Sequence, residues 1–295
     1  MTKSFVSAVV LAALVVPVAA CRFELLPSDP SPVQLPVGTD VDASTRDASS
    51  VDTTTADTTT DAAGPWGCLG KVPALPAEDP NTPVHHVRRF VGLLDLKPLS
   101  EVPVRACVPS GVECLELAGS PKATDANGTV DVLLYRGFRG FLDIAAPAKG
   151  PDLVPGRIYL GPDDEASKSG VPPWPSAIPT KSELEFSAAS AGKQIRPEYG
   201  HLFFLSLDCQ HKAAANTVAR VEPIAADTFT FYVDSAGTPS LTQAKTSSTG
   251  VGAFVNLPVG GISVTFSRDD GTRIGERTVI IRAGAITYLP LAPTP

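Results

Sequence analysis

The four histidines are the first residues that could do chemistry, because imidazole is a common metal ligand and general base. His85 and His86 are adjacent, so on a strand their side chains would point to opposite faces. His201 and His211 are ten residues apart, and the sequence contains no HExxH motif. This spacing favours surface or interfacial histidines, and we predict no metal site, no cofactor and no catalytic residue.

Cysteine is the second reactive residue type, and four of the five cysteines follow residue 21. In an exported chain an even number of cysteines indicates disulfides, and four allow three pairings. Cys107 and Cys114 flank the turn-rich hexapeptide VPSGVE, which could bring them together and leave Cys68 for Cys209. A zinc site would need CxxC pairs or histidines at ligand spacing, and the sequence has neither.

Carboxylates recur at matching places in two similar stretches of the chain. Asp95 and Asp208 could in principle act as an acid and base pair, but a role in capping turns explains them better. Asp125, Asn127 and Asp131 place oxygen atoms at alternate positions, as calcium loops do. The DxDxDG spacing is absent, so calcium is an alternative to an ordinary turn here.

Two further motifs bear on function. Gly250-Val251-Gly252 lacks the third glycine and the following helix of a dinucleotide site, and Ser263 lies in an alternating strand rather than in a nucleophile elbow. A basic and aromatic stretch could form an exposed recognition edge, although phenylalanine is usually a core residue. Its members are Arg136, Phe138, Arg139 and Phe141.

The N-terminus has the pattern of a targeting signal. Lys3 precedes an apolar run of sixteen residues, Phe5 to Ala20, which is short for a membrane span. Its end, Val-Ala-Ala-Cys21, resembles the lipobox of bacterial lipoproteins, which implies cleavage and lipidation of Cys21 with diacylglycerol. An ordinary signal peptide or an uncleaved anchor are the alternatives. Arg22 stands where an inner-membrane retention signal has aspartate, so the analogy implies the outer membrane.

Residues 21–64 are predicted to form a disordered tether. They are rich in Pro, Ser, Asp and Thr and contain too little apolar surface to offset the entropy of ordering. Residues 37–63 contain six aspartates and one arginine, and so hold −5 of the net charge of −7. The rest of the chain is nearly neutral, which excludes a basic field for nucleic acid.

The remaining chain contains two copies of one β unit. Thr124 to Gly128 leads into an alternating apolar run and, after Arg136-Gly137, a second run at 141–144, which is the pattern of a β-hairpin. The step from Thr246 to Gly250 repeats it, with Gly260 near the place of Gly137. We predict a first domain at 65–160 and a second domain at 199–295. The proline-rich arm at 66–84 is expected to be attached to the first domain.

The segment between the units, 161–198, is predicted to be a linker that contains the single helix. Thr180 and Glu183 form a capping box before the helical sequence LEFSAASAGK, and Gly192 ends it.

The order of signals in each unit resembles the carboxypeptidase regulatory-like domain. In that family a Thr-x-x-x-Gly turn precedes an apolar strand and a Leu-Pro-x-Gly element, which Leu257 to Gly260 matches; Leu134 to Gly137 lacks the proline. The resemblance covers about 55 residues of each unit, and it implies a non-catalytic, transthyretin-like sandwich of seven strands. The whole chain also resembles lipoproteins of predatory soil bacteria such as myxobacteria.

Together these patterns predict an all-β protein with two Ig-like or transthyretin-like β-sandwich domains, joined by a loop and one short helix. The predicted function is that of a lipid-anchored, non-catalytic protein of the outer membrane, with a role in binding, adhesion or structural support. Its expected partners are the membrane, through the lipid anchor, and a protein or polysaccharide ligand, but no nucleic acid. The alternative is an envelope hydrolase or enzyme subunit with a site at the domain interface, near the Trp174 loop.

Overall fold

The computed structural model describes residues 64–110, 113–160 and 176–295. Cys21, the predicted signal and tether, and Trp174 lie outside the described residues. The strands of the first half are β1 (Asp79–Gly92), β2 (Pro103–Ser110), β3 (Glu113–Glu116), β4 (Lys122–Ala123), β5 (Thr129–Arg136), β6 (Phe141–Ile144), β7 (Gly156–Tyr159) and β8 (Ser176–Ile178). Helix α1 (Lys181–Ser190) follows. The strands of the second half are β9 (Gly200–Ser206), β10 (Thr217–Glu222), β11 (Phe229–Val233), β12 (Pro239–Ser240), β13 (Val251–Leu257), β14 (Gly260–Arg268), β15 (Arg273–Ile281) and β16 (Ile286–Leu291).

The two halves have the same strand plan, and the all-β prediction is confirmed. In the first half one sheet has the order β5-β1-β8, and the facing strands have the order β2-β6-β7. In the second half the sheet β13-β9-β16 corresponds to β5-β1-β8, and the sheet β10-β14-β15 corresponds to β2-β6-β7. The pairing of β1 with β8 is parallel, as is that of β9 with β16. Each half therefore forms a sandwich of two sheets around its own apolar cluster.

The repeated Thr-x-x-x-Gly step performs the same structural role in both copies. The Thr124 hydroxyl donates to the carbonyl of Leu99 and accepts from the amide of Val102. In the second copy Thr246 donates to the Ala214 carbonyl and accepts from the Thr217 amide. Both hydroxyls are buried. Each one links the turn before β5 or β13 to the segment at the start of β2 or β10. The predicted duplication is thus visible at the level of single hydrogen bonds.

The glycines of the two turns are constrained by close backbone contact. Gly128 has a φ of 73° and Gly250 a φ of 68°, a region that favours glycine. A Cβ atom at either position would collide with a backbone carbonyl, that of Phe90 or that of Ser206. The same two residues, Phe90 and Ser206, donate their amides to the glycine carbonyls at 2.8 Å in both copies.

The predicted hairpins are wrong, although the strands themselves are present. β5 pairs with β1, whereas β6 pairs with β2 and β7, so the chain crosses from one sheet to the other between them. β13 and β14 lie in different sheets in the same way. The physical reason is that Val132 of β5 and Leu142 of β6 both face the first core, which a facing pair of sheets buries better than a flat hairpin.

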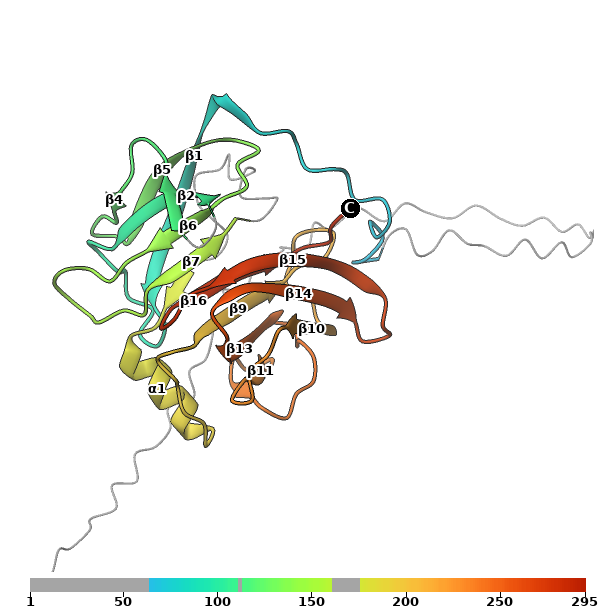
Figure 1. The fold of residues 1–295 in the computed structure, drawn as a ribbon. Coiled ribbons are helices and arrows are strands. Elements are labelled where there is room, and N and C mark those ends of the chain that lie inside the picture. The colour runs from blue at the N-terminus through green and yellow to red at the C-terminus, as the bar shows by residue number, and fades with distance from the viewer. Residues whose placement is uncertain (1–63, 111–112, 161–175) are drawn as a thin grey trace, which may run out of the picture.

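The sandwiches are joined edge to edge as well as by the connecting segment. β7 of the first pairs in parallel with β16 of the second, which makes a ten-stranded sheet across both halves (Figure 1). One row of paired residues crosses neighbouring strands of this sheet, from Asp143 through Arg157 and Thr287 to Leu202. Leu202 belongs to the second core, whereas the first core uses the alternate row. Because paired residues share a face, the two cores lie on opposite faces of the shared sheet.

Helix α1 covers part of this sheet and confirms the predicted capping box. The Thr180 hydroxyl accepts from the Glu183 amide, and the Glu183 carboxylate accepts from the Thr180 amide. The helix ends at Ser190, and Gly192, with a φ of 68°, supplies the left-handed residue after the cap. Leu184 packs with Ile286 of β16 in a small separate cluster. Residues 176–178, within the stretch predicted as linker, form β8 and pair with β1.

Two disulfides join the predicted pairs. Cys107 and Cys114 are linked across β2 and β3, with Cα atoms 5.0 Å apart, and Cys68 is linked to Cys209, with Cα atoms 5.7 Å apart. The second bond corrects part of the expectation that the arm at 66–84 is attached to the first unit. Its start, with Trp66 and Leu69, packs against the second core, whereas its later part, with Ala77, packs against Gly137 of the first sandwich. From there the arm runs to β1 of the first sandwich (Figure 1).

Candidate functional site

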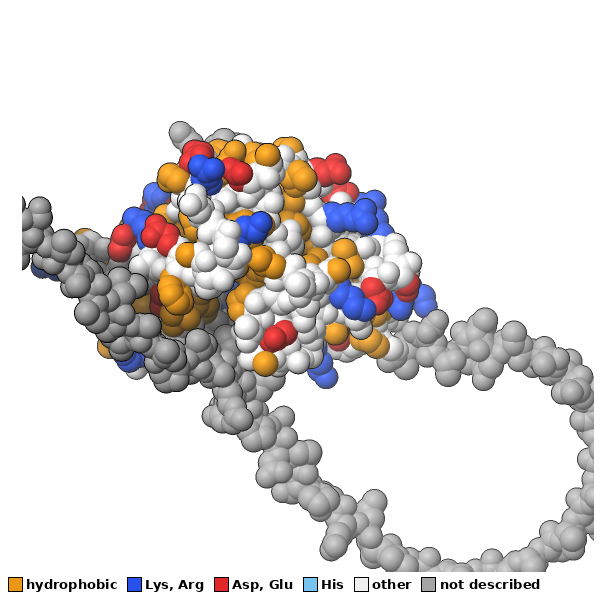
Figure 2. All heavy atoms as spheres, turned by 90° about the horizontal axis from the view of Figure 1, so that it is seen from below, with side chains coloured by type: hydrophobic (Ala, Val, Ile, Leu, Met, Phe, Trp, Pro, Cys, Tyr) orange, Lys and Arg blue, Asp and Glu red, His pale blue; other side chains and the backbone are white. Residues whose placement is uncertain are grey.

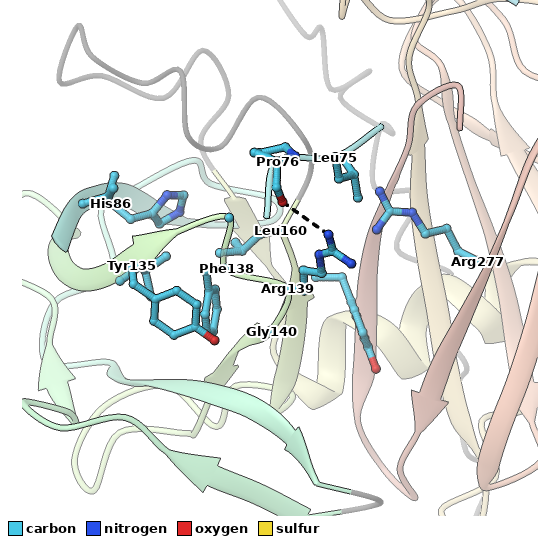
Figure 3. A pocket seen from close by; sticks show the side chains of 13 residues that line it. Leu75, Pro76, His86, Tyr135, Phe138, Arg139, Gly140, Leu160 and Arg277 are labelled. Atoms are coloured by element: carbon cyan, nitrogen blue, oxygen red, sulfur yellow. Dashed lines mark hydrogen bonds between the residues drawn. The ribbon is translucent and has the colours of Figure 1, made fainter. Parts of the chain in front are cut away.

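The candidate site is a cleft between the two sandwiches, with a cavity volume of about 110 Å³ (Figure 3). It is lined by the arm, by β1, by the link between β5 and β6, by the end of β7 and by one residue of β15. The side chains that give it its chemical character are Tyr135, Phe138, Arg139, Tyr159 and Arg277. Both sandwiches therefore contribute to one concave surface.

The link from β5 to β6 forms the wall on the side of the first sandwich. The end of β5 and the link read YRGFRG, in which Gly137 has a φ of 74° and a side chain would collide with the carbonyl of Ala77. The arm thus packs directly on the backbone of the link. The Phe138 ring meets Tyr135 edge to face at 5.1 Å, and the Arg139 guanidinium donates to the Pro76 carbonyl at 3.3 Å.

Arg277 comes from the edge strand of the second sandwich. It pairs with Val264 in the sheet and has the same parity along β15 as the core residues Val279 and Ile281. Its side chain therefore starts on the inward face of the strand and emerges where the apolar core ends. Figure 3 shows the guanidinium pointing from β15 toward Leu75 and Arg139.

The electrostatics of the cleft are one-sided. None of the described residues that line it is an aspartate or a glutamate. Within the described part of the chain, neither the Arg139 nor the Arg277 guanidinium forms an ion pair with a carboxylate. Burial lowers the pKa of Arg277 and raises the pKa of Tyr159, because both charged forms lose solvent. A cleft whose described lining holds two guanidinium groups is suited to binding an anion.

A cluster of charges fixes the second sandwich against the first, next to the cleft. The buried carboxylate of Asp143 accepts from Arg105, from Arg157 at 3.4 Å and from Arg282 at 2.7 Å. Arg282 follows β15, so this contact crosses the junction. Burial, followed by the charge of Arg282, lowers the pKa of Arg157. The Ile280 amide also donates to the Tyr159 hydroxyl at 2.9 Å, which ties β15 to the wall of the cleft.

The structure places the four histidines apart. His85 is exposed and contacts Asp131 at 2.9 Å, whereas the adjacent His86 is buried and lines the cleft, so they do point to opposite faces. His201 is buried in β9, and burial lowers its pKa to about 4. Its Nδ1 atom accepts from the amide of Asn256. Among the described residues no group of three or more His, Cys, Asp or Glu is arranged to hold a metal ion.

The repeated aspartates serve as turn caps, as predicted. Asp95 accepts from the amide of Lys97, and Asp208 accepts from those of Gln210 and Lys212. They lie in different sandwiches.

The three residues weighed for calcium are engaged separately. Asp125 accepts from the amides of Asn127 and Thr129, which closes the turn. Asp131 of β5 is paired with His85 of β1. The turn interpretation, rather than a calcium loop, accounts for these contacts.

The proposed recognition edge is divided between three places. Phe138 and Arg139 line the cleft, and Arg136 lines a neighbouring hollow with Pro76 to Asp79. Phe141 is buried in β6, with the Arg157 guanidinium 4.5 Å above its ring. Arg277 was not expected from the sequence, although a signal exists: it is a charged residue at an apolar position of an alternating strand.

Comparisons with known proteins give only remote structural likenesses. No protein-family model matches the sequence, and no curated protein matches it. Among solved structures, the TIE protein of Bacillus anthracis is 14% identical over 72% of this chain, with a TM-score of 0.22. The chain spans about a third of that protein, 34% of its length.

Two pilins show likeness of the same kind. The shaft pilin SpaA of Lactobacillus rhamnosus GG is 10% identical over 72% of this chain and 99% of its own, with a TM-score of 0.24. The minor pilin GBS52 of Streptococcus agalactiae is 14% identical over 73% of this chain and 98% of its own, with a TM-score of 0.21. At these TM-scores the likenesses carry no inference about function.

Proposed function

We propose that the protein is a lipid-anchored, non-catalytic component of the cell envelope, in which the double sandwich serves binding, adhesion or structural support. The observation that carries the proposal is the N-terminal sequence, in which a charged start and sixteen apolar residues end in Val-Ala-Ala-Cys21. Lipidation of Cys21 with a diacylglycerol and a further acyl chain would hold the protein stably on a bilayer. The expected location is the outer membrane.

Two features of the folded part support this proposal. Both disulfides suit an oxidising compartment outside the cytoplasm. The described residues contain no helix that is long and apolar enough to cross a membrane. An attachment through Cys21 would supply the membrane contact.

The surface and the cleft favour binding over hydrolysis. On the face shown in Figure 2, acidic and basic side chains are interspersed with hydrophobic ones. The cleft occupies the place that the alternative, an enzyme with an interface site, would need. Its described lining supplies guanidinium groups, phenols and one imidazole, that of His86. This set of groups holds an anion more readily than it activates water.

Labelling with radioactive palmitate in the native host tests the anchor. We expect label on the wild-type protein and none on Cys21→Ala, with Ser28→Ala in the same tether as the control that retains label. We also expect the wild type in the outer-membrane fraction and Cys21→Ala outside it. Equal labelling of Cys21→Ala and wild type, or an unlabelled wild type, would refute the proposal.

A further inference from the structure

The cleft between the sandwiches has the charge and shape of a binding site for a specific class of ligand. We infer that it binds a hexuronic acid unit of an acidic polysaccharide, with the carboxylate between Arg139 and Arg277 and the sugar ring on the aromatic and aliphatic wall. The choice of a polysaccharide as the source of the carboxylate rests on the proposed envelope function. The chemistry of the site does not depend on it.

The two guanidinium groups define the charge of the ligand. Arg139 belongs to the first sandwich and Arg277 to the second, and both line the same cavity. Glu78, which lines the neighbouring hollow, accepts from the backbone amide of Arg139 at 3.2 Å, and its carboxylate also interacts with the Tyr135 phenol at the edge of the cleft. Arg277 is half-buried and Arg139 is exposed. Because a half-buried charge is normally paired, the Arg277 guanidinium with a second guanidinium in the same cleft favours a bound anion. The planar fork of arginine fits a carboxylate with two parallel hydrogen bonds.

The rest of the lining defines the body of the ligand. A volume of about 110 Å³ is below the roughly 150 Å³ of a cavity that takes up benzene, so a sugar ring would be held at the mouth of the cleft and only partly enclosed. Phe138, Leu75 and Leu160 present apolar surface beside the charged groups. A bare inorganic anion would leave this surface in water. A sugar ring that carries a carboxylate would cover it with its C–H face while the carboxylate reaches the arginines.

The walls of the cleft are held in place without a ligand. Gly137 packs against the arm, the Tyr159 hydroxyl accepts from the amide of Ile280, and Arg282 contacts Asp143 across the junction. These contacts fix β15, and with it Arg277, relative to the link that carries Arg139. A preformed site loses little entropy when the ligand binds.

Calorimetric titration of the full-length chain in detergent tests the inference. The probes are trigalacturonic acid, the neutral sugar galactotriose and a triglutamate peptide. We expect trigalacturonate to bind, with the affinity falling as salt rises, and galactotriose to bind at least tenfold more weakly. Arg277→Gln and Arg139→Gln should each weaken trigalacturonate binding by about tenfold or more, because each removes a charged hydrogen-bond donor. Arg277→Lys, which keeps the charge but not the fork, should lie between Arg277→Gln and wild type.

Arg220→Gln is the matched control, because Arg220 is exposed on β10 of the second sandwich. It removes the same charge and should leave the affinity unchanged. Equal loss in Arg220→Gln and Arg277→Gln, equal binding of galactotriose, tighter binding of triglutamate, or no binding of trigalacturonate would each overturn the inference. If Arg277→Gln fails to fold, the exposed Arg139→Gln gives an independent answer. An unlabelled Cys21 would refute the anchor and leave this titration unaffected.

Discussion

The two sandwiches are copies of one plan, yet they meet through non-equivalent edges. Across the junction β16 of the second copy pairs with β7 of the first. By position in the strand plan, β16 is equivalent to β8, whereas β7 is equivalent to β15. A join between equivalent edges would be symmetric. This one buries the outer face of the first sandwich, with its charges at Asp143 and Arg157, beneath residues that follow β15. The way the copies are joined therefore brings Arg277 to a cleft whose other described lining residues come from the arm and the first sandwich.

The same position in the two copies also meets different surroundings. His85 and His201 each lie five residues before the strand residue, Phe90 or Ser206, that donates its amide to the turn glycine. His85 is exposed on the first sandwich, whereas His201 is 1% exposed in the centre of the shared sheet. Likewise each copy has one disulfide, but the two close loops of very different length. Variants at equivalent positions of the two copies can therefore distinguish effects of the shared strand plan from effects of the junction.

The largest expected effect concerns the disulfides. The bond between Cys68 and Cys209 spans 141 residues, and that between Cys107 and Cys114 spans 7. In the chain-entropy model the first stabilises the fold by about 5 kcal/mol and the second by about 2.5 kcal/mol, because a longer loop loses more freedom in the unfolded state. We expect the double change Cys68→Ser with Cys209→Ser to lower the free energy of unfolding more than Cys107→Ser with Cys114→Ser. Urea unfolding without reductant measures both, and a reversed order would contradict this account.

The junction provides the next largest effect. Asp143→Ala would leave Arg157 buried and Arg282 half-buried without their shared carboxylate, and removing one partner of a buried ion pair costs about 3–5 kcal/mol. We expect urea unfolding to show a loss of this order. Asp131→Ala, which breaks the exposed pair with His85, is the control and should cost less than about 1 kcal/mol. Similar losses in the two variants would mean that the cluster does not hold the junction.

The two histidines should differ in acid. Burial lowers the pKa of His201 to about 4, below the value of 6.5 that an unfolded chain has. As the pH falls, the unfolded state therefore takes up a proton before the folded state does. The contribution of His201 to the free energy of unfolding is complete above pH 6.5 and is lost as the pH falls toward 4. The total loss is about 3 kcal/mol. We expect His201→Gln to flatten the fall of the unfolding free energy between pH 7 and pH 4.5.

His85→Gln is the matched control, at the equivalent and exposed position of the first copy. The slope of this variant is the reference for that of His201→Gln. An unchanged slope in His201→Gln would show that other groups cause the loss of stability in acid.

Sequence reasoning succeeded where the signal is local. The capping box at Thr180 and Glu183, the aspartate caps and the Thr-x-x-x-Gly turns are each contained within about five residues, and each forms as expected. It failed where the answer depends on distant partners. A short link such as Arg136 to Gly140 is compatible with both a hairpin and a crossover, and only the partners of β5 and β6 decide between them. The cleft was beyond reach for the same reason, since Arg139 and Arg277 are brought together by the pairing of β7 with β16.

The smallest effect tests whether the copies are energetically equal. Thr124→Val and Thr246→Val keep the shape of the side chain and remove one hydroxyl, which leaves a buried amide and a carbonyl without this partner in each copy. The expected loss is about 2 kcal/mol for either variant, from the range for unsatisfied buried groups. Ser182→Ala, next to the helix cap but without a bond to the backbone among those described, should change the unfolding free energy by less than about 0.5 kcal/mol. Urea unfolding of the three variants measures these differences. Equal losses at Thr124 and Thr246 would show that the two hydroxyls contribute equally in the two copies, whereas a loss confined to one copy would contradict the expectation that both stabilise the fold.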